Sequence, residues 1–326
     1  MTATPRSIAD SPDVLSELLR AVRLTGSVFL NGRFSAPFGV ISPARWDEQD
    51  QLARLRHVSV FHLIAEGECQ VKTADGVVRD LRKGDLILLP FTAEHRFWSG
   101  EPESFAFGPD LLVQGPINGV DLVAHGGGGA VTRLVCGYIE SAELLGAPLF
   151  RSLPNLIVER TGDDAMAGML AGTAAEILRQ VDEAAPGAPF LLGRLMELLF
   201  VEVLRRHAAR LPADAGGMLA AMRDPVVARA LSSLHQEPAR RWTIDDLATE
   251  AGASRTVLAE RFHRLVGRPP IEYLTAWRIQ LAAERLKAGR DPLARIAETV
   301  GYESEAAFSR AFKREMGVSP GAWRGG

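Results

Sequence analysis

The sequence has few cysteines and no long apolar run, and both absences exclude classes of protein. Cys69 and Cys136 are the only cysteines in 326 residues, too few for a disulfide scaffold and typical of a reducing compartment. No apolar stretch approaches the roughly 20 residues that cross a bilayer. The first residues, MTATPRSIADSPD, lack the basic start, apolar middle and cleavage site of a secretory signal. We therefore expect a cytoplasmic protein with no membrane partner.

An overall excess of positive charge is also lacking. The net charge is −3, which on its own argues against binding to nucleic acid. The charges are unevenly distributed, however. From Asp224 to the C-terminus 16 Lys and Arg stand against 13 Asp and Glu, a balance of +3, whereas the preceding residues carry −6. A DNA-facing domain joined to an acidic partner domain shows this kind of asymmetry, and the chain is long enough for two domains.

The last third of the sequence contains the same pattern twice. Residues 244–270 align with residues 293–320 at an offset of 49 before one turn and 50 after it. A repeat of this length predicts one supersecondary unit that occurs twice. The matching pairs are Leu247/Ile296, Ala248/Ala297, Gly252/Gly301, Ser254/Ser304, Leu258/Phe308, Phe262/Phe312, Gly267/Gly317 and Pro270/Pro320.

Capping signals indicate where the helices of each copy begin. Thr243 can cap the first helix, with Asp246 completing a capping box. In the second copy Asp291 is expected as the cap, with Pro292 at the first helical position, where its missing N–H does no harm. The glycines of the repeat then end the first helices, and the serines cap the second ones. A single copy would be equally compatible with a plain α-hairpin; two copies favour helix-turn-helix units.

A further helix, from about Ile271 to Lys287, is predicted between the two copies. At ~1.5 Å per residue it would be ~25 Å long. Such a spacer could hold the two second helices about one turn of DNA, ~34 Å, apart. One chain could then read two adjacent major grooves.

The segment DPLARIAETVGYESEAAFSRAFKREMGVSPGAWR resembles the C-terminal signature of the AraC/XylS family of transcription regulators. Residues 240–286 resemble the first helix-turn-helix and the connecting helix of the same family, and the match runs from about Asp224 to Arg324. The resemblance implies that the second helix of each unit enters the major groove. It places base contacts on Thr256, Ala259 and Glu260 in the first unit and on Glu305, Ala306, Ser309 and Arg310 in the second.

The chemistry of these side chains sorts them into base and phosphate contacts. Arg310 can bind guanine O6 and N7, a glutamate can accept from cytosine N4, and an alanine offers only a methyl contact. Arg255 and Lys313, like Arg261 and Arg314, are better placed for phosphates. The capping residues Ser254 and Ser304 complete the expected DNA-binding surface. The alternative is that these charged side chains only form a solvated helix face and do not contact DNA.

Between Ser59 and Tyr138 short β-rich runs alternate with turn signals, which predicts an antiparallel sandwich or barrel. The run from Gly84 to His95 resembles the second sequence motif of cupins. Counting along the first cupin motif places Val60, Arg54 and Arg56 where metal ligands usually stand. Only His95 then matches the usual ligand set. A first-row metal needs three or four converging ligands, and His95 with the nearby His57 and His62 does not establish such a set. We therefore expect no metal, no cofactor, no catalytic residue and no enzymatic activity.

The strands, the helix expected at Pro12–Leu24 and the tract LVAHGGGGAVTRLVC resemble the cupin domain of one subgroup of AraC/XylS regulators. That resemblance implies sensing of oxidants or electrophiles by Cys136, with Cys69 as a partner and His62 and His95 nearby. A sensor thiol should be partly exposed with a depressed pKa. Arg133 cannot supply the charge, because three residues along a strand put it on the opposite face. Two small buried hydrophobes are the favoured alternative.

Residues 163–209 are predicted to be helical, and the second helix, with apolar residues nearly all round, should be buried. It could pack on the barrel or pair with its copy in a homodimer. The expected fold is α+β and multidomain: a cupin-like β-barrel (jelly roll) with a short N-terminal helix over residues 1–150, a helical connector and linker over 151–217, and an all-α DNA-binding domain over 218–326.

The function expected is sequence-specific DNA binding that regulates transcription, modulated by a signal at the cupin-like domain. The expected partners are double-stranded promoter DNA, RNA polymerase and a small-molecule or oxidant effector. Two alternatives stay open. One is a metal-dependent cupin enzyme with an appended helical domain, and the other is a structural DNA-binding protein without a sensor.

Overall fold

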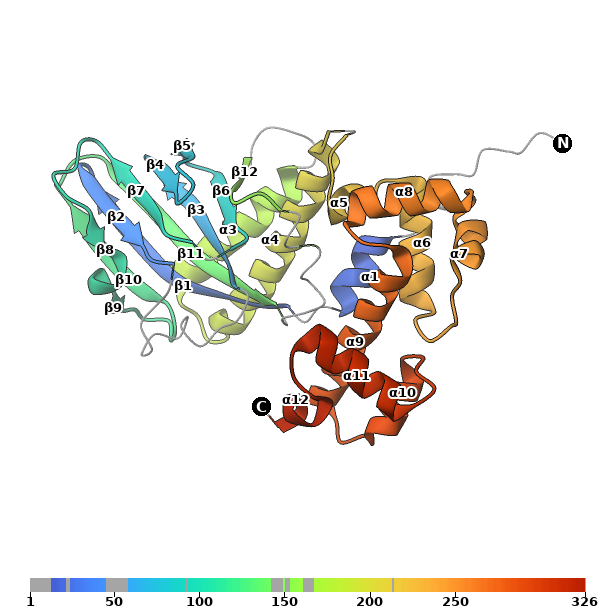
Figure 1. The fold of residues 1–326 in the computed structure, drawn as a ribbon. Helices are drawn as coiled ribbons and strands as arrows, with labels where there is room; N and C mark the ends of the chain where they lie inside the picture. The colour runs from blue at the N-terminus through green and yellow to red at the C-terminus, as the bar shows by residue number, and fades with distance from the viewer. Residues whose placement is uncertain are drawn as a thin grey trace. The chain divides into compact units, whose positions relative to one another are not determined.

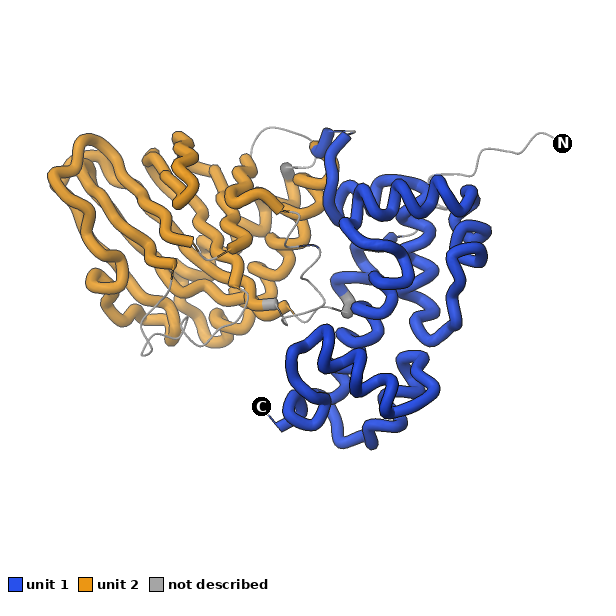
Figure 2. The backbone as a smooth tube through the Cα atoms, viewed as in Figure 1, with its two compact units in different colours: residues 1–23, 143–152, 211–326 blue, residues 24–142, 153–210 orange. Residues whose placement is uncertain are grey.

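The computed structural model describes residues 13–21, 24–44, 58–91, 93–141, 149, 153–160, 167–212 and 214–325. Backbone contacts divide the chain into two compact units (Figures 1 and 2). Unit 1 comprises residues 1–23, 143–152 and 211–326, and unit 2 comprises residues 24–142 and 153–210. The first helix of the chain thus groups with the C-terminal residues rather than with the strands that follow it. In the described part of the chain, no helix is both long and apolar enough to span a membrane.

Unit 2 is built on two β-sheets. In the larger sheet the strands lie in the order β12 (Ile157–Arg160), β6 (Asp85–Leu89), β3 (Val58–Glu66), β11 (Val131–Ser141), β1 (Leu24–Ser35), β10 (Asp121–Gly126) and β9 (Val113–Gln114). In the smaller sheet the order is β5 (Val78–Arg82), β4 (Glu68–Thr73), β7 (His95–Ser99), β2 (Phe38–Ser42) and β8 (Ala106–Phe107).

Most neighbouring strands are antiparallel, but β1 runs parallel to β10 and β2 runs parallel to β8. The inward side chains of both sheets form one apolar core that includes Phe29, Ile64 and Phe97. The two sheets stay separate, so of the sandwich and the barrel that the sequence left open the unit is a jelly-roll-like sandwich, as the cupin-like prediction implies. Strand β4 alternates between buried and more exposed residues, whereas β3 and β6 are buried along nearly their whole length, as continuous apolar runs predict for strands covered on both faces.

Two helices of unit 2, α3 (Ala167–Glu183) and α4 (Ala188–Arg210), pack against each other, and α4 also lies on β1 and β11. This contact settles one of the two placements open for the apolar helix: it packs on the sheet. The approach is close at two glycines. A Cβ on Gly26 of β1 would lie 2.5 Å from the carbonyl oxygen of Gly193 on α4, so a side chain there would push the helix away.

The described residues of unit 1 form helices and the loops between them. Its helices are α1 (Val14–Ala21), α5 (Met218–Ala221), α6 (Pro225–Gln236), α7 (Ile244–Ala251), α8 (Arg255–Val266), α9 (Pro270–Ala288), α10 (Leu293–Thr299), α11 (Glu305–Met316) and α12 (Pro320–Gly325). The helix pairs α7–α8 and α10–α11 are the two copies of the repeat, and α9 is the predicted spacer between them (Figure 1).

The capping predictions hold for three of the four helices of the repeat. The capping box of Thr243 and Asp246 opens α7, and Gly252 ends it with φ 65°. Ser254 and Ser304 cap α8 and α11 by accepting hydrogen bonds from the N–H groups of Val257 and Ala307, at 3.3 and 3.2 Å.

The expected cap of α10 is wrong by one residue. Pro292, and not Asp291, is its N-cap, with ψ 145° and no hydrogen bond from a side chain. The φ of Pro292, −57°, would fit a helix, but its ψ is extended, so the helix begins at Leu293. Asp291 is used differently, since its carbonyl oxygen accepts a hydrogen bond from Arg324 at 2.6 Å.

Candidate DNA interface and ligand cavity

The helix α8 presents a polar face and hides an apolar one. Leu258 and Phe262 are fully buried, as their spacing of four residues predicts. Arg255, Thr256 and Glu260 are exposed, and so is the cap Ser254, whereas Ala259 is half-buried. The side chains that the sequence assigns to DNA therefore share the outward face of one helix.

The helix α11 repeats this arrangement. Phe308 and Phe312 are fully buried in a core that α9 and α10 complete. The outward residues begin at the cap. They are Ser304, Glu305, Ala306, Arg310 and Lys313, which are exposed, and Ser309, which is half-buried.

Ion pairing distinguishes the basic residues of the two helices. Arg261 lies 3.3 Å from Asp224, the cap of α6, and Arg255 lies 3.9 Å from Asp245. Among the residues that the structure describes, Arg310 and Lys313 make no ion pair. Arg310 and Lys313 of α11 are therefore available to a partner, whereas Arg314 of the same helix lies 3.6 Å from Glu315, and Arg255 and Arg261 of α8 are partly engaged within the protein.

The spacer α9 supports both copies. It packs against α6 and α8 on one side of the repeat and against α10, α11 and α12 on the other. Its buried residues include Tyr273, Trp277 and Ile279. With 19 residues it is about 28 Å long, at about 1.5 Å per residue. It therefore fixes α8 and α11 within one compact unit, as a rigid spacer must.

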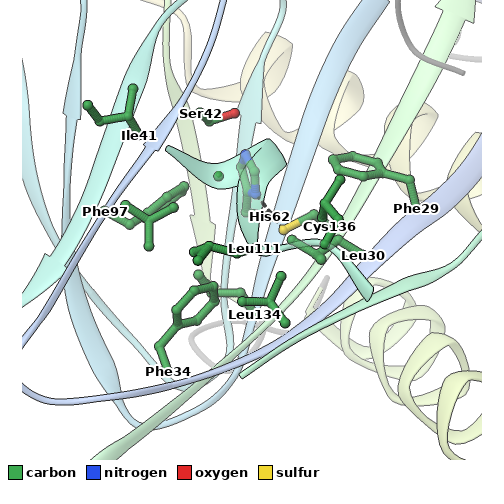
Figure 3. Close-up of a pocket in the computed structure, with 14 residues that line it drawn as sticks. Phe29, Leu30, Phe34, Ile41, Ser42, His62, Phe97, Leu111, Leu134 and Cys136 are labelled. Carbon is green, nitrogen blue, oxygen red and sulfur yellow. Dashed lines mark hydrogen bonds between the residues drawn. The ribbon is translucent and has the colours of Figure 1, made fainter. Parts of the chain in front are cut away.

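Unit 2 contains a cavity between its sheets (Figure 3). The space between its walls, including the open mouth, is about 490 Å³. Strands β1 and β2 supply Phe29, Leu30, Phe34 and Ile41, and the short 3-10 helix η3 (Gly108–Leu111) supplies Leu111. The polar side chains of the wall are few: among the described lining residues they are Ser42, His62 and Cys136.

Cys136, His62 and His95 form a chain of contacts at the cavity wall. The sulfur of Cys136 lies 2.8 Å from Nδ1 of His62, whose Nε2 lies 3.0 Å from Nε2 of His95. Nδ1 of His95 lies 2.9 Å from the carbonyl oxygen of Ala93. A carbonyl only accepts, so His95 carries its proton on Nδ1 and accepts on Nε2. His62 must then donate from Nε2, and its Nδ1 accepts from the thiol of Cys136.

The surroundings keep this chain uncharged. Burial, and then the proximity of His95, hold the pKa of His62 well below its ordinary value. Burial lowers the pKa of His95 to about 4, although the bond to Ala93 acts in the opposite direction. Burial, and then Cys69, raises the pKa of Cys136 far above that of a free thiol. Both histidines and the thiol are therefore neutral near pH 7.

The expected properties of a sensor thiol are not met. Cys69 and Cys136 are 4% and 2% exposed, and burial, with a smaller effect of Asp85, raises the pKa of Cys69 to about 12. Arg133 points away from the cavity, as the strand period predicts, and binds Asp182 of α3. Both cysteines are buried, as the alternative predicts, but Cys136 also makes a hydrogen bond to His62.

The two histidines are close together but do not converge with the cysteine on one point. His62 faces Cys136 with one ring nitrogen and His95 with the other. Within the described ranges no three histidine, cysteine or acidic side chains form a group that could hold a metal ion. Arg54, Arg56 and His57, which bear on the first cupin motif, lie outside the described residues.

Sequence reasoning missed most of the cavity. It identified His62, His95 and Cys136 but not the aromatic and aliphatic wall from β1, β2 and η3. The aromatic and β-branched residues of Leu24–Ser42, divided by Ala36 and Pro37, would have indicated these strands.

Comparisons with known proteins agree with this architecture. A family model described as "Cupin" matches residues 13–209, and one described as "Helix-turn-helix domain" matches residues 247–326. A putative AraC-like transcription regulator of Streptomyces lividans is 35% identical over 320 residues, 96% of each chain. The HTH-type transcriptional regulator AlkR of Acinetobacter baylyi is 30% identical over 81% of this chain and 87% of its own.

Among solved structures, the DNA-binding domain of AdpA in complex with a target DNA is 27% identical. It covers 31% of this chain and 91% of that one, with a TM-score of 0.30. The relative from Streptomyces spans both units of the chain at substantial identity, and the two family models cover the cupin strands and the repeat. The chain therefore belongs to the AraC-type transcription regulators that carry an N-terminal cupin domain.

Proposed function

We propose that this regulator reads promoter DNA with α8 and α11 in adjacent major grooves. The observation that carries the proposal is the pair of capped helices with outward polar faces on one rigid spacer. Arg310 reads a guanine, Glu260 and Glu305 accept from cytosine, and Ser309 and Thr256 bind either base or backbone. Arg255 and Lys313 bind phosphates, and Ser254 and Ser304 hold the N-termini of the helices at the groove.

Selection of random DNA by the purified protein tests this proposal. We expect enriched sequences with two short elements about 10 base pairs apart, one for each helix. Arg310→Ala should erase information only in the element read by α11, and Glu260→Ala only in the other. One undivided element, altered equally by both variants, would show that the helices do not read separate grooves.

We propose further that the signal is a small molecule in the cavity of unit 2, and that the unit is not an enzyme. The described wall is apolar apart from one hydroxyl, one thiol and one imidazole. The thiol and the imidazole are already bonded to each other, and no described lining side chain is charged. A charged ligand would lose its hydration without gaining a counter-ion. The effector should therefore be uncharged and mainly hydrocarbon, with at most one polar group, for Ser42.

Matched probes of equal chain length test the class of ligand. We expect 1-decanol to raise the melting temperature of the protein, with decanoate and decylamine having much smaller effects. Leu111→Trp, which fills the cavity, should abolish the response, and Leu122→Trp on the exposed face of β10 serves as the matched control. A larger response to decanoate than to decanol would refute an uncharged effector. Oxidation of Cys136 as the signal predicts instead that Cys136→Ser abolishes regulation in cells.

We also propose that α4 pairs with its copy in a homodimer. The face of α4 that does not lie on the sheet exposes Phe190, Leu191 and Leu198, at 68%, 45% and 52%. Leu191 and Leu198 are seven residues apart and so lie on one stripe of the helix. Leu198→Asp should shift the sedimentation coefficient to that of a monomer.

RNA polymerase is the expected partner of the DNA-bound protein, and transcription from a selected site in a purified system tests it.

A further inference from the structure

The turn of the second helix-turn-helix unit packs directly on a loop of the first. This loop, residues 237–242, lies between α6 and α7 and reaches toward α10 (Figure 1). Gly301, in the turn between α10 and α11, has φ 87°, and a Cβ added to it would lie 2.7 Å from both the Cα and the carbonyl oxygen of Ala239. Only a glycine allows two backbones to approach so closely. The two copies of the repeat therefore meet at a point away from the spacer α9.

A side chain of the spacer fastens the same loop. Arg278 of α9 donates hydrogen bonds to the carbonyl oxygens of Pro238 and Arg240, at 2.6 and 2.8 Å. Its guanidinium carbon also lies 6.0 Å from the ring centroid of Tyr302, in the turn that packs on the loop. Tyr302 in turn packs edge-on against Phe308 of α11, with 5.6 Å between the ring centroids. Arg278 thus connects the loop of the first copy to the second recognition helix.

The loop is itself held by the first copy. The guanidinium of Arg240 lies 3.8 Å from the ring centroid of Trp242 and 3.6 Å from the carboxylate of Glu250 on α7. Trp242 is 8% exposed, and its indole N–H donates to the carbonyl oxygen of Glu237 at 3.0 Å. The 237–242 loop is therefore an ordered part of the first unit, so it can resist a movement of the turn that packs on it.

The equivalent turn of the first copy is held in a different way. Gly252 has the matching position and a φ of 65°, but the nearest atom to an added Cβ is a terminal nitrogen of Arg229, at 3.4 Å. Arg229 of α6 precedes Arg278 by 49 residues, the offset of the repeat, and donates to the carbonyl oxygen of Ala251 at 2.6 Å. This arginine thus holds the turn of its own copy, whereas Arg278 holds a loop of the other copy. The close contact of backbones belongs to the second turn, and the first turn provides a matched control.

We propose that the 237–242 loop is a second brace between the two helix-turn-helix units, which fixes the orientation of α11 relative to α8 and so selects one spacing of the two DNA elements. The spacer α9 is a single attachment, and a helix can bend along its length. A second attachment away from the axis of α9 removes that freedom. Gly301 and Arg278 are then positioning residues, since they act through the loop and need not contact DNA.

The selectivity follows from the geometry of the duplex. One added base pair moves an element by ~3.4 Å and rotates it by ~35° about the duplex axis, so a braced pair of helices cannot follow both elements. The selectivity rests on the proposed reading of two elements by α8 and α11. The brace itself is tested without DNA.

Distances between spin labels, measured by pulsed electron paramagnetic resonance on the full-length protein, test the brace. His263→Cys on α8 and Lys313→Cys on α11 supply the labels at exposed, matching positions of the repeat, and the two native cysteines are buried. We expect one narrow distribution of distances. Because α9 alone can bend, Gly301→Ala and Arg278→Ala should each broaden it about twofold.

Matched controls separate the brace from general effects of these changes. Gly252→Ala places the same methyl group at the same kind of turn, and Arg285→Ala removes the same charge from an exposed position of α9. Both should leave the distribution unchanged. An unchanged width in Gly301→Ala would overturn the brace. If that variant loses helical signal in circular dichroism, Arg278→Ala, which leaves the turn unaltered, decides in its place.

Competition binding with spacing variants of a selected DNA tests the consequence. We expect the wild-type protein to bind about thirtyfold more weakly when one base pair is inserted between the two elements, because one helix loses its base contacts. In Gly301→Ala and Arg278→Ala the loss should fall to about threefold, while the affinity for the original spacing stays within about tenfold. Gly252→Ala should keep the preference of the wild-type protein.

The two measurements distinguish failure of the brace from failure of the proposed function. A wild-type protein that binds all spacings equally would contradict the reading of two elements, yet the label distances would still decide the brace. A strong spacing preference that survives in both Gly301→Ala and Arg278→Ala would overturn the selectivity assigned to the loop.

Discussion

The two units use polar side chains in opposite ways. In the cupin unit His62, His95 and Cys136 are at most 3% exposed, and each has a hydrogen-bond partner. On α11 of the DNA-binding unit Arg310 and Lys313 are exposed and, among the described residues, form no ion pair. Buried polar side chains whose hydrogen bonds are already made offer no counter-ion to a charged ligand. Exposed basic side chains without an ion pair can bind an anionic partner. This difference is the basis for our proposal that the cupin unit takes an apolar signal while α8 and α11 take DNA.

The largest expected effect concerns the glycine contact that holds α4 on the sheet. Gly26→Ala places a methyl group 2.5 Å from the carbonyl oxygen of Gly193, so the helix must move. We expect a loss of about 3 kcal/mol in the free energy of unfolding, the upper end of the usual range for overpacked cores. Urea unfolding of the cupin unit, followed by tryptophan fluorescence, measures it.

Gly172→Ala on α3 is the matched control, because nothing lies within 4 Å of its added Cβ. In a helix this change should stabilise by up to about 1 kcal/mol. Equal effects of the two variants would mean that the close approach of β1 and α4 is not a constraint.

The next largest effect is expected from acid, which should lower the stability of the cupin unit. The folded pKa of His95 is lowered from 6.5 to about 4 by burial, so the unfolded chain binds a proton that the folded one refuses. The stability contributed by neutral His95 is full above about pH 6.5 and is lost as the pH falls toward 4, by about 3 kcal/mol. The pKa of His62 is also lowered by burial, which adds a loss of the same sign.

Unfolding by urea at a series of pH values measures this loss. Because other groups also gain protons as the pH falls, the comparison is between the wild-type protein and His95→Gln. The glutamine can still donate to the carbonyl of Ala93 but has no proton to gain. We expect a flatter dependence in the variant between pH 6.5 and 4. Parallel curves would contradict the role assigned to His95.

The sequence predicted the DNA-binding unit well because its signals are local. Thr243 and Asp246 form their capping box within four residues, and Ser304 caps α11 within the same span. Where the local signal was ambiguous, at Asp291 and Pro292, the prediction failed by one residue. Each of these structures depends on neighbours in the chain, which the sequence displays directly.

The cavity depends on contacts between distant residues, and the sequence showed much less of it. His62 and His95 are 33 residues apart and meet only because β3 and β7 belong to sheets that face each other. Phe97 of β7 packs against both rings, at 4.8 and 5.4 Å between ring centroids, and the strands β1 and β2 that complete the cavity wall were not predicted. Similarly, nothing near Glu17 in the sequence points to its hydrogen bond with Ser232, 215 residues away.

In the DNA-binding unit, Arg310→Ala tests whether the exposed arginine of α11 reads a base. A bidentate contact to guanine discriminates by about 1–3 kcal/mol, so the variant should lose preference at one base pair and little elsewhere. Competition binding with single-base variants of a selected site measures it. Equal loss of affinity for selected and random DNA would show that Arg310 binds the backbone instead.

The smallest effect is expected for Lys313→Ala. This variant distinguishes a side chain that binds a phosphate from one that reads a base on the same helix. Lys313 is exposed in the last turn of α11, one turn beyond Arg310. A lysine that neutralises one phosphate releases about one counterion, so its loss should reduce the slope of log K against log salt by about 0.9. The order of preference among DNA sequences should stay the same, because phosphates carry no sequence information. Titrations of the wild-type protein and the variant at several salt concentrations measure the slope. A changed base preference with an unchanged slope would contradict this role. It would mean that Lys313 reads a base and does not neutralise a phosphate.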